Sequence, residues 1–348
     1  NEGKKKLYFV DNTDEFIDFS RAVRSAPMIT LNLYDAVKNQ LEWVRYANQK
    51  KLYGIKYWEL GNEIYWHTKI RASEYQDLIT RYYEELKRID PTTKVSVCVG
   101  ANPNENIRNG EKDWLKAVAE RKGSYDAVSI HLYWGGNESV SEPFSERTIK
   151  NIFAYTSYGL RKQIDYLLDG LGQDTELWLT EWNFGYYKSR NFNSLLHALY
   201  VADILCQIAL VDSIKIATFW DLKEGPYEIF YLKKGLVRRP PYYVFKLFAD
   251  SIRKGMKIVK TTVEGGNFTI SNQERYGILV WNEVKAIPPI PYIQTLATID
   301  RDLNKLYLLV INRDITANRD VLIIISGARV SIQANVYLIT GQSIEDRN

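Results

Sequence analysis

The sequence predicts an α/β fold followed by an all-β domain, and three observations support this. From residue 7 to about residue 255, short apolar runs alternate with segments of helical spacing, which is typical of parallel β-α units. The apolar runs are β-branched or aromatic, as expected for strands covered on both faces. After about residue 256 the helical spacing stops, and β-prone runs split by turn residues predict a β-sandwich. We therefore divide the chain into residues 1–255 and residues 256–348.

Six runs in the first part are predicted to be strands. Six strands fit two architectures: an open doubly wound sheet, or an eight-stranded barrel whose first two β-α units are absent from this chain. A barrel of that kind has an exposed sheet edge, so we expect a second chain or a preceding segment of the protein to complete it. A homo-oligomer is a separate expectation. The predicted strands are Met28–Leu33, Ile55–Leu60, Lys94–Val99, Ala127–Leu132, Glu176–Leu179 and Ile214–Phe219.

Helices are predicted between these strands. In Ser73–Ile89 the apolar side chains follow helical spacing, and Pro91 lies just beyond the end. Ser73 and Gln76 are candidates for a capping box at its start. The other predicted helices are Asp14–Ser25, Leu41–Asn48, Asp113–Arg121, Thr148–Leu168, Ser194–Leu210 and Tyr242–Ile252.

The second part is predicted to contain only strands and turns. Its proline-rich segment Ile287–Tyr292 is predicted to be a loop. The predicted strands are Thr261–Glu264, Phe268–Ser271, Tyr276–Trp281, Thr295–Ile299, Leu306–Asn312, Val321–Ile325 and Val330–Thr340.

The composition excludes several classes of protein. The net charge of +4 is spread along the chain, so no nucleic-acid partner is indicated, and no run of residues is apolar enough for a membrane span. The three histidines and two cysteines show no metal-binding spacing. Two methionines and two cysteines beside many Lys, Arg and Glu residues are compatible with a thermophilic source.

Glu63 is the first candidate for chemistry. It follows the predicted strand that ends at Leu60 and precedes an aromatic loop that contains Trp66, so it lies where barrel enzymes place catalytic groups. Asn62 beside it offers a hydrogen bond to a sugar hydroxyl, a contact that strengthens in the transition state of glycoside cleavage. The alternative is a strand-end Asn-Glu pair that caps the next helix.

Glu181 is the second candidate, at the end of another predicted strand. Trp182 and further aromatics follow it at once, and aromatic rings stack on the C–H faces of sugars. Two strand-end carboxylates are the minimum set for hydrolysing a glycosidic bond: one protonates the leaving oxygen, and the other attacks the anomeric carbon or activates a water. This chemistry needs no metal or organic cofactor. From the residues alone, the assignment of the two roles stays open.

Residues 12–255 resemble the glycoside hydrolases of clan A, and most of all family 51, the α-L-arabinofuranosidases and related endoglucanases. The resemblance implies a (β/α)8 TIM-barrel fold lacking its first two β-α units, followed by a C-terminal β-sandwich. It would make Met28–Leu33 the third strand. The motifs that carry it are Tyr57–Glu63, Ser73–Tyr75 with Asp90-Pro91, Ser129–Tyr133 and Thr180–Asn183.

The resemblance also implies roles for individual residues. Glu63 would be the general acid/base and Glu181 the nucleophile of a retaining, double-displacement mechanism. Tyr133 would hydrogen-bond the nucleophile, and His131 would line the same subsite; the alternative for His131 is a core histidine paired with a neighbour. Asn32 matches a sugar-binding asparagine at the end of the third strand.

Two departures from the family bear on the substrate. The last predicted barrel strand leads into Trp220, where arabinofuranosidases carry a sugar-binding glutamine, and Trp220 is typical of a stacking platform for pyranosides. The early arginine of the family's subsite would lie before residue 1. An α-L-arabinofuranoside, a β-glucan, a xylan or another plant-type glycan is therefore a candidate substrate, with exo or endo attack.

The main alternative from another class is a non-catalytic carbohydrate-binding or structural protein on a degenerate barrel. The two intact carboxylates, Glu63 and Glu181, argue against it. A polymeric glycan as substrate favours an extracellular location over a cytoplasmic one.

Overall fold

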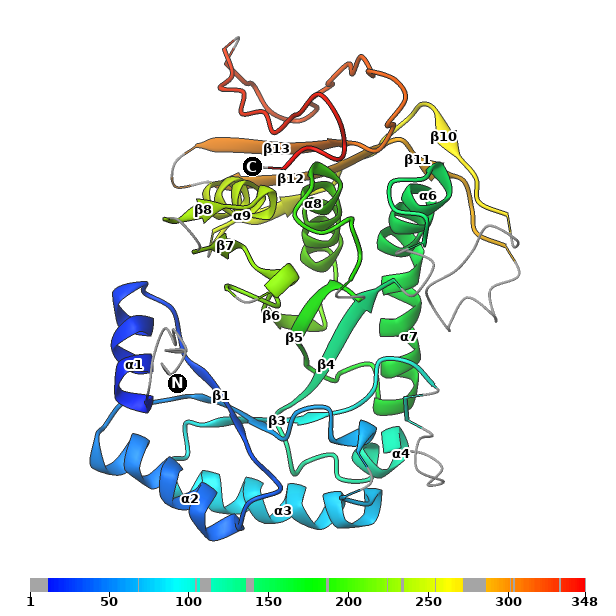
Figure 1. The fold of residues 1–348 in the computed structure, drawn as a ribbon. Coiled ribbons are helices and arrows are strands. Elements are labelled where there is room, and N and C mark those ends of the chain that lie inside the picture. Colours follow the sequence, from blue (N-terminus) through cyan, green and yellow to red (C-terminus); the bar gives the residue numbers. More distant parts are fainter. Residues whose placement is uncertain are drawn as a thin grey trace, which may run out of the picture. The chain divides into compact units, whose positions relative to one another are not determined.

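The computed structural model describes residues 12–67, 69–103, 105–106, 114–135, 141–185, 188–223, 225–232, 235–253, 255–271, 286–300, 302, 304–331 and 333–347 (Figure 1). The chain divides into two compact units, each described by itself below. Unit 1 comprises residues 1–131 and 165–179, and unit 2 comprises residues 132–164 and 180–348. The boundary predicted at residues 255 and 256 stays a prediction, because strands β12 and β13 pack against helix α8 within unit 2.

All six strands predicted in the first part are present. They follow one another in sequence order across the sheet, β1-β2-β3-β4-β5-β6, and the pairs β1–β2, β2–β3 and β3–β4 are parallel. A doubly wound sheet reverses its strand order at a switch point, so the sequential order excludes that architecture and identifies a β/α half-barrel. The strands are β1 (Met28–Leu31), β2 (Tyr57–Leu60), β3 (Lys94–Cys98), β4 (Ala127–Trp134), β5 (Leu177–Phe184) and β6 (Ile214–Ala217).

Every predicted helix of the first part is also present, within a few residues of its predicted ends. Two of them continue through a π-helical turn, which the helical spacing did not predict. The helices are α1 (Thr13–Ala22), α2 (Val37–Arg45) with the π-turn η1 (Tyr46–Lys50), α3 (Ala72–Ile89), α4 (Trp114–Ala119), α6 (Glu146–Ala154), the π-turn η4 (Tyr155–Gly159), α7 (Leu160–Leu171), α8 (Leu195–Ala209) and α9 (Pro240–Ser251). No helix in the described part of the chain has the length and apolar character that a membrane crossing needs.

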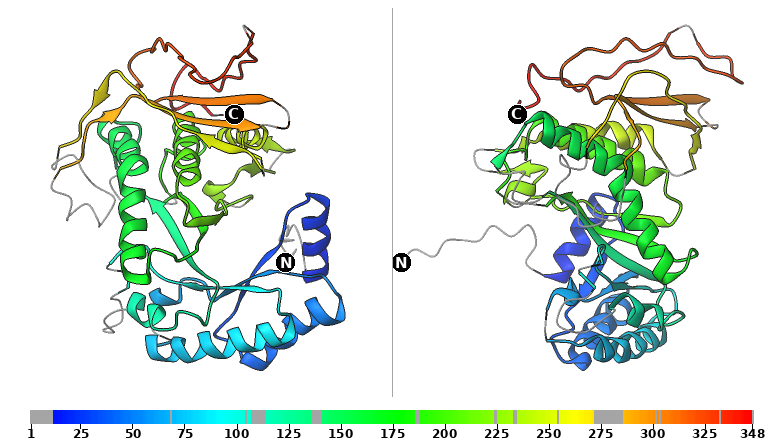
Figure 2. Two further views of the ribbon diagram at one scale, coloured as in Figure 1. Left: turned by 180° about the vertical axis from the view of Figure 1, so that it is seen from behind. Right: turned by 90° about the vertical axis from the view of Figure 1, so that its right-hand side faces the viewer.

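In unit 1, helices α2 and α3 lie side by side (Figures 1 and 2). The fully buried Tyr75 of α3 donates its hydroxyl hydrogen to the carbonyl of Leu60 at 2.8 Å and accepts from the backbone N–H of Cys98 at 2.9 Å. Because Leu60 ends β2 and Cys98 ends β3, one helix side chain holds the carboxyl ends of two strands.

The start of α3 corrects one expectation. The N-cap is Arg71, and the Glu74 carboxylate accepts from the backbone N–H of Arg71 at 2.9 Å and from its guanidinium at 3.0 Å. The predicted capping pair of Ser73 and Gln76 is therefore wrong, because the helix begins one residue earlier than the serine.

In unit 2, the C-terminal strands form antiparallel sheets (Figure 1). The predicted strands Thr295–Ile299 and Leu306–Asn312 are confirmed as parts of β12 and β13. A short β11 lies in the segment predicted to be a loop. The elements are β7 (Phe230–Tyr231), β8 (Val237–Arg238), β9 (Lys257–Val259), β10 (Asn267–Phe268), β11 (Ile290–Pro291), β12 (Ile293–Asp300) and β13 (Lys305–Asn312), with the strand order β13-β12-β9 in the three-stranded sheet.

Other strands predicted for the second part are corrected. The described residues of Val321–Ile325 and Val330–Thr340 form no strand, and Leu322 and Val336 are 85% and 84% exposed. The strand predicted at Thr261–Glu264 is replaced by β9, which lies earlier in the chain. The prediction for Tyr276–Trp281 lies outside the described residues. The all-β character predicted for this part is confirmed, since its described residues form antiparallel sheets, although they form fewer strands than the sequence predicted.

Candidate functional site

Glu63 lies in a tight turn directly after β2. Gly61 has a φ of +79°, and a Cβ at this position would lie 3.0 Å from Cγ2 of Ile64, so the turn requires glycine. Glu63 itself is in the left-handed region, with φ 47° and ψ 31°, which costs a residue with a Cβ about 1–2 kcal/mol. Strained backbone of this kind concentrates at functional positions. The turn leaves the Glu63 side chain 33% exposed.

The Glu63 carboxyl group is paired with a buried histidine in unit 1. Nδ1 of His131 on β4 lies 2.8 Å from Oε1 of Glu63, and His131 is 7% exposed. The imidazole N–H donates when the carboxyl group is ionised, and the carboxyl O–H can donate to a bare Nδ1. The contact therefore holds the carboxyl group in one orientation and gives its proton a neighbouring site. This contact is compatible with both interpretations of His131, as a subsite residue and as a buried histidine with a partner, because that partner is the candidate acid/base.

Two further ionisable groups near Glu63 were not found from the sequence. Burial, together with the charge of Glu63, raises the pKa of the Glu105 carboxyl group, although hydrogen bonds from Asn102 oppose the shift. Burial next to both carboxylates raises the pKa of the Tyr65 hydroxyl well above its usual value. The signal that could have found Glu105 was its place seven residues after Cys98, in the loop that follows β3.

Glu181 lies within β5 in unit 2. The Tyr133 hydroxyl group donates to Oε2 of Glu181 at 2.7 Å, which is the contact that the resemblance implied. The ring of Tyr227 packs edge-on against the Tyr133 ring, with 6.3 Å between their centroids. A hydroxyl donor favours the ionised form of a carboxyl group. Glu181 therefore has the environment that a nucleophile requires, namely a fixed orientation and a donor to its charged oxygen.

The remaining predicted site residues fall into two groups. Asn32 and Asn62 are exposed, Trp66 is half-buried and Trp220 is 44% exposed, so these four have surface to offer to a ligand. Asn32 also closes a turn, since its Oδ1 accepts from the backbone N–H of Tyr34 at 3.0 Å.

Trp182 has a different environment from the other candidates. It is 1% exposed, and its ring packs against Phe219 and Phe245 at centroid distances of 4.9 and 6.1 Å. Successive side chains of a strand point to opposite faces, so Trp182 points away from the face that carries Glu181. The structure gives Trp182 a core position, and we do not include it among the residues proposed to contact a sugar.

A buried polar pair follows Glu181. Nε2 of His197 on α8 lies 2.7 Å from Oδ1 of Asn183, and both residues are 0% exposed. Burial lowers the pKa of His197 to about 3, so the ring is neutral at physiological pH. Sequence reasoning considered His197 only as a possible metal ligand, and the spacing of 14 residues between a strand and a helix carried no signal.

The low pKa of His197 predicts a dependence of stability on pH. In unfolded chains a histidine titrates near 6.5, so between about pH 6.5 and about pH 3 the unfolded state binds a proton that the folded state does not. The contribution of His197 to the free energy of unfolding should therefore be fully present above pH 6.5. Below pH 6.5 the free energy of unfolding should fall by about 1.4 kcal/mol per pH unit. Urea unfolding at pH 7.0, 6.0 and 5.0 measures this slope. In His197→Gln this slope should be smaller by about 1.4 kcal/mol per pH unit. An equal slope in the wild type and the variant would contradict the prediction.

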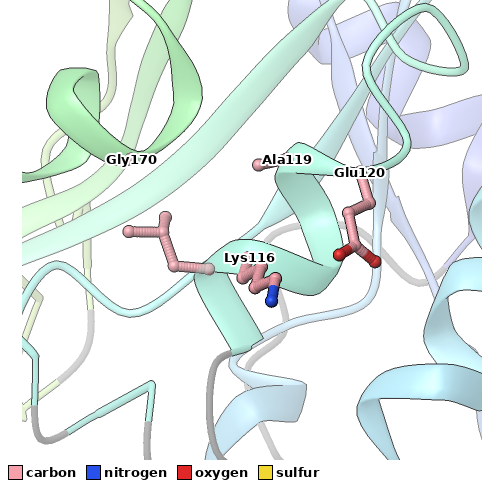
Figure 3. Close-up of a pocket in the computed structure, with 5 residues that line it drawn as sticks. Lys116, Ala119, Glu120 and Gly170 are labelled. Atoms are coloured by element: carbon pink, nitrogen blue, oxygen red, sulfur yellow. The ribbon is translucent and has the colours of Figure 1, made fainter.

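A cavity of about 440 Å³ lies elsewhere in unit 1 (Figure 3). It is lined by Leu115, Lys116 and Ala119 of α4, by Glu120 directly after that helix and by Gly170 of α7. None of these residues is at the carboxyl end of a strand, and none is a candidate for chemistry. The cavity is therefore separate from the candidate site.

Comparisons with known proteins agree with the fold. No model of a protein family matches the sequence. The chain is 25% identical over 203 residues to the intracellular exo-α-(1→5)-L-arabinofuranosidase 1 of Bacillus subtilis, a match covering 51% of this chain and 39% of that protein. The structure of an α-L-arabinofuranosidase from Thermotoga maritima in complex with arabinose has a TM-score of 0.66 at 24% identity and covers 86% of this chain and 63% of that one. The structure of a family 51 α-L-arabinofuranosidase from Bifidobacterium longum has a TM-score of 0.69 at 16% identity. That match covers 87% of this chain and 65% of the other.

The fold is thus that of a glycosidase of the β/α-barrel class. Over the part that this chain spans, it is more narrowly the fold of the α-L-arabinofuranosidases of glycoside hydrolase family 51, so the resemblance read from the sequence is confirmed for the fold. The chain spans less than two thirds of the length of each of the three proteins. The comparisons give no support to the thermophilic source that the composition suggested.

Proposed function

We propose that the protein is a retaining glycoside hydrolase in which Glu63 is the general acid/base and Glu181 the nucleophile. The observation that carries the proposal is that a side chain of β4 holds each carboxylate: His131 holds Glu63, which follows β2, and Tyr133 holds Glu181, which lies within β5. His131 and Tyr133 are two residues apart on that strand, so both leave its same face, about 6.5 Å from each other along the chain. Double displacement uses a pair of carboxyl groups, one to attack the anomeric carbon and one to transfer a proton.

The proposed reaction runs in two steps. Glu181 attacks the anomeric carbon while Glu63 protonates the leaving oxygen, which forms a glycosyl-enzyme and releases the first product. Glu63, now ionised, removes a proton from a water molecule that attacks the same carbon and frees Glu181. Tyr133 steadies the charge on Glu181 before attack, and His131 offers a place for the proton of Glu63. Two inversions at one carbon give a product that retains the configuration of the substrate.

An α-L-arabinofuranoside is the leading candidate substrate, supported by the names of the relatives. A β-linked pyranoside such as a glucan is the second candidate. The observation that favours it is Trp220, whose 44% exposed side chain after β6 offers an apolar surface to a six-membered sugar ring.

A panel of aryl glycosides tests the proposal: α-L-arabinofuranoside, β-xyloside, β-glucoside and β-cellobioside. Turnover of at least one, with the retained anomer as the first product in proton NMR, is expected. A first product of inverted configuration would refute the assignment of Glu181 as nucleophile. A folded protein that binds these glycans without turning any over would favour the non-catalytic alternative.

Glu63→Ala should show the signature of a lost acid catalyst. Loss of proton transfer costs about 10²- to 10⁴-fold in rate. We expect that loss in kcat/KM for substrates with poor leaving groups, and little loss for a dinitrophenyl glycoside, whose leaving group departs without a proton. The measurement is the dependence of kcat/KM on the pKa of the leaving group, which should steepen in the variant.

Glu84→Ala is the matched control for this variant, because Glu84 is an exposed glutamate on α3 in the same unit. It should behave as wild type on every substrate. Equal losses in Glu63→Ala for good and poor leaving groups would mean that Glu63 has another role.

A further inference from the structure

We propose that Asn183 and His197 form a buried positioning relay that holds the backbone after Glu181 against the backbone at Trp220 and Tyr227. They are positioning residues: neither is placed to touch a substrate, since both are 0% exposed. The relay itself stands on contacts within unit 2. Its consequence for catalysis rests on the function proposed above.

The relay is a directed chain of hydrogen bonds. The backbone N–H of Asn193 donates to Nδ1 of His197 at 3.2 Å, so this ring nitrogen is the acceptor and Nε2 carries the hydrogen. Nε2 of His197 then donates to Oδ1 of Asn183 at 2.7 Å. The burial that keeps the ring neutral preserves this pattern, because a doubly protonated ring has no acceptor for the Asn193 N–H.

The Asn183 side chain also contacts a second backbone segment, the one that contains Trp220 and Tyr227. Its Nδ2 donates to the carbonyl of Trp220 at 2.5 Å and lies 3.4 Å from the carbonyl of Tyr227. The Asn183 backbone is also held, since its own carbonyl accepts from the Tyr200 hydroxyl at 3.0 Å. One side chain two residues after Glu181 therefore joins β5, α8 and the segment that follows β6.

Both ends of this relay reach the surroundings of Glu181. Asn183 is two residues from it on β5, and Tyr227 packs against Tyr133, which donates to the Glu181 carboxylate. Trp220, whose carbonyl the relay holds, is the exposed aromatic ring beyond β6. Loss of the relay should therefore displace the nucleophile and the Trp220 ring together, whereas an ordinary core contact would affect only stability.

The packing around His197 makes the relay rigid and suggests the test variants. Phe184 stacks on the His197 ring, with centroids 4.9 Å apart and planes at 26°, and Phe192 meets it edge-on at 5.2 Å. His197→Phe should fill this aromatic site without offering a donor or an acceptor. His197→Gln places an amide N–H near the position of Nε2 and should restore the bond to Asn183.

The experiment compares wild type, His197→Phe and His197→Gln by hydrogen–deuterium exchange and by steady-state kinetics. In His197→Phe we expect faster exchange in peptides covering residues 181–185 and 218–231, with unchanged exchange in α3 of unit 1. A misplacement of about 1 Å can cost roughly 10²-fold, so kcat should fall about 10- to 100-fold while KM stays within about threefold. His197→Gln should restore both exchange and kcat most of the way.

The other outcomes contradict either the relay itself or its role in positioning Glu181. Unchanged exchange in His197→Phe, or faster exchange throughout the chain with no rescue by glutamine, overturns the relay. Local exchange changes with kcat unaltered leave a purely structural contact and overturn its role in positioning. If wild type turns over no glycoside, the proposed function fails, and the contrast in exchange between phenylalanine and glutamine still decides whether the relay holds the two segments.

Discussion

Glu181→Gln is expected to lower kcat by about 10⁴-fold or more on every glycoside that the wild type cleaves, because loss of the nucleophile removes the covalent pathway. The glutamine oxygen can still accept from the Tyr133 hydroxyl, so the local contact at 2.7 Å has a neutral substitute and the variant should fold. Rates measured with an aryl glycoside carrying a good leaving group isolate this step, because departure of that group then needs no acid. Thermal unfolding should show a Tm close to that of the wild type.

Glu176→Gln is the matched control, since Glu176 precedes the same strand and is used structurally. Its carboxylate accepts from Nε1 of Trp178 at 2.8 Å and pairs with Lys94 at 3.3 Å. This control should keep wild-type kcat. Azide added to Glu181→Ala should restore turnover and yield a glycosyl azide of inverted configuration, because the small anion attacks from the side that the carboxylate leaves vacant. Undiminished activity in Glu181→Gln would remove Glu181 from the mechanism.

Asp203→Ala is expected to be the most destabilising single change in unit 2. Arg313 and Asp203 are 1% and 0% exposed and pair at 2.6 Å, and the Thr156 hydroxyl group also donates to Asp203. The variant leaves the buried Arg313 guanidinium group without its carboxylate partner. Its other acceptors are the Pro291 carbonyl and the Gln294 side chain, both at 3.3 Å. Breaking a buried pair on one side costs about 3–5 kcal/mol. Denaturant unfolding measures this loss.

Two control variants distinguish the cost of an unpaired buried charge from the cost of lost packing. Asp203→Leu combined with Arg313→Met removes both charges, and it should cost much less than Asp203→Ala, because apolar replacements of buried pairs are often close to neutral. Glu42→Ala breaks the exposed pair with Lys38, whose side chains are 57% and 82% exposed, and should cost less than about 1 kcal/mol. Equal losses in the single and double variants would mean that packing, and not the unpaired charge, determines the effect.

The candidate site was partly accessible from the sequence. Glu63 and Glu181 could be located because strand ends are recognised from local patterns, and parallel strands bring their carboxyl ends to one edge of a sheet. The partners of these glutamates could not be derived from the residues. The bond from His131 to Glu63 joins positions 68 residues apart, and no local pattern encodes a pairing over that distance. Trp182 shows the opposite error, since proximity in sequence to Glu181 placed it at the site while the alternation of a strand turns it into the core.

The sequence by itself determined the β-α alternation, the six strands and the helices between them, because each depends on a periodicity within a few turns of chain. It also located the two carboxylates at the ends of predicted strands, although β5 continues to Phe184, beyond Glu181. The tertiary structure decided the sequential strand order, the partners of Glu63 and Glu181, the burial of Asn183 with His197, and the fate of the C-terminal strands. A β-prone run such as Val321–Ile325 becomes a strand only where a neighbouring strand supplies its hydrogen bonds and covers its side chains, and that neighbour is chosen by the fold.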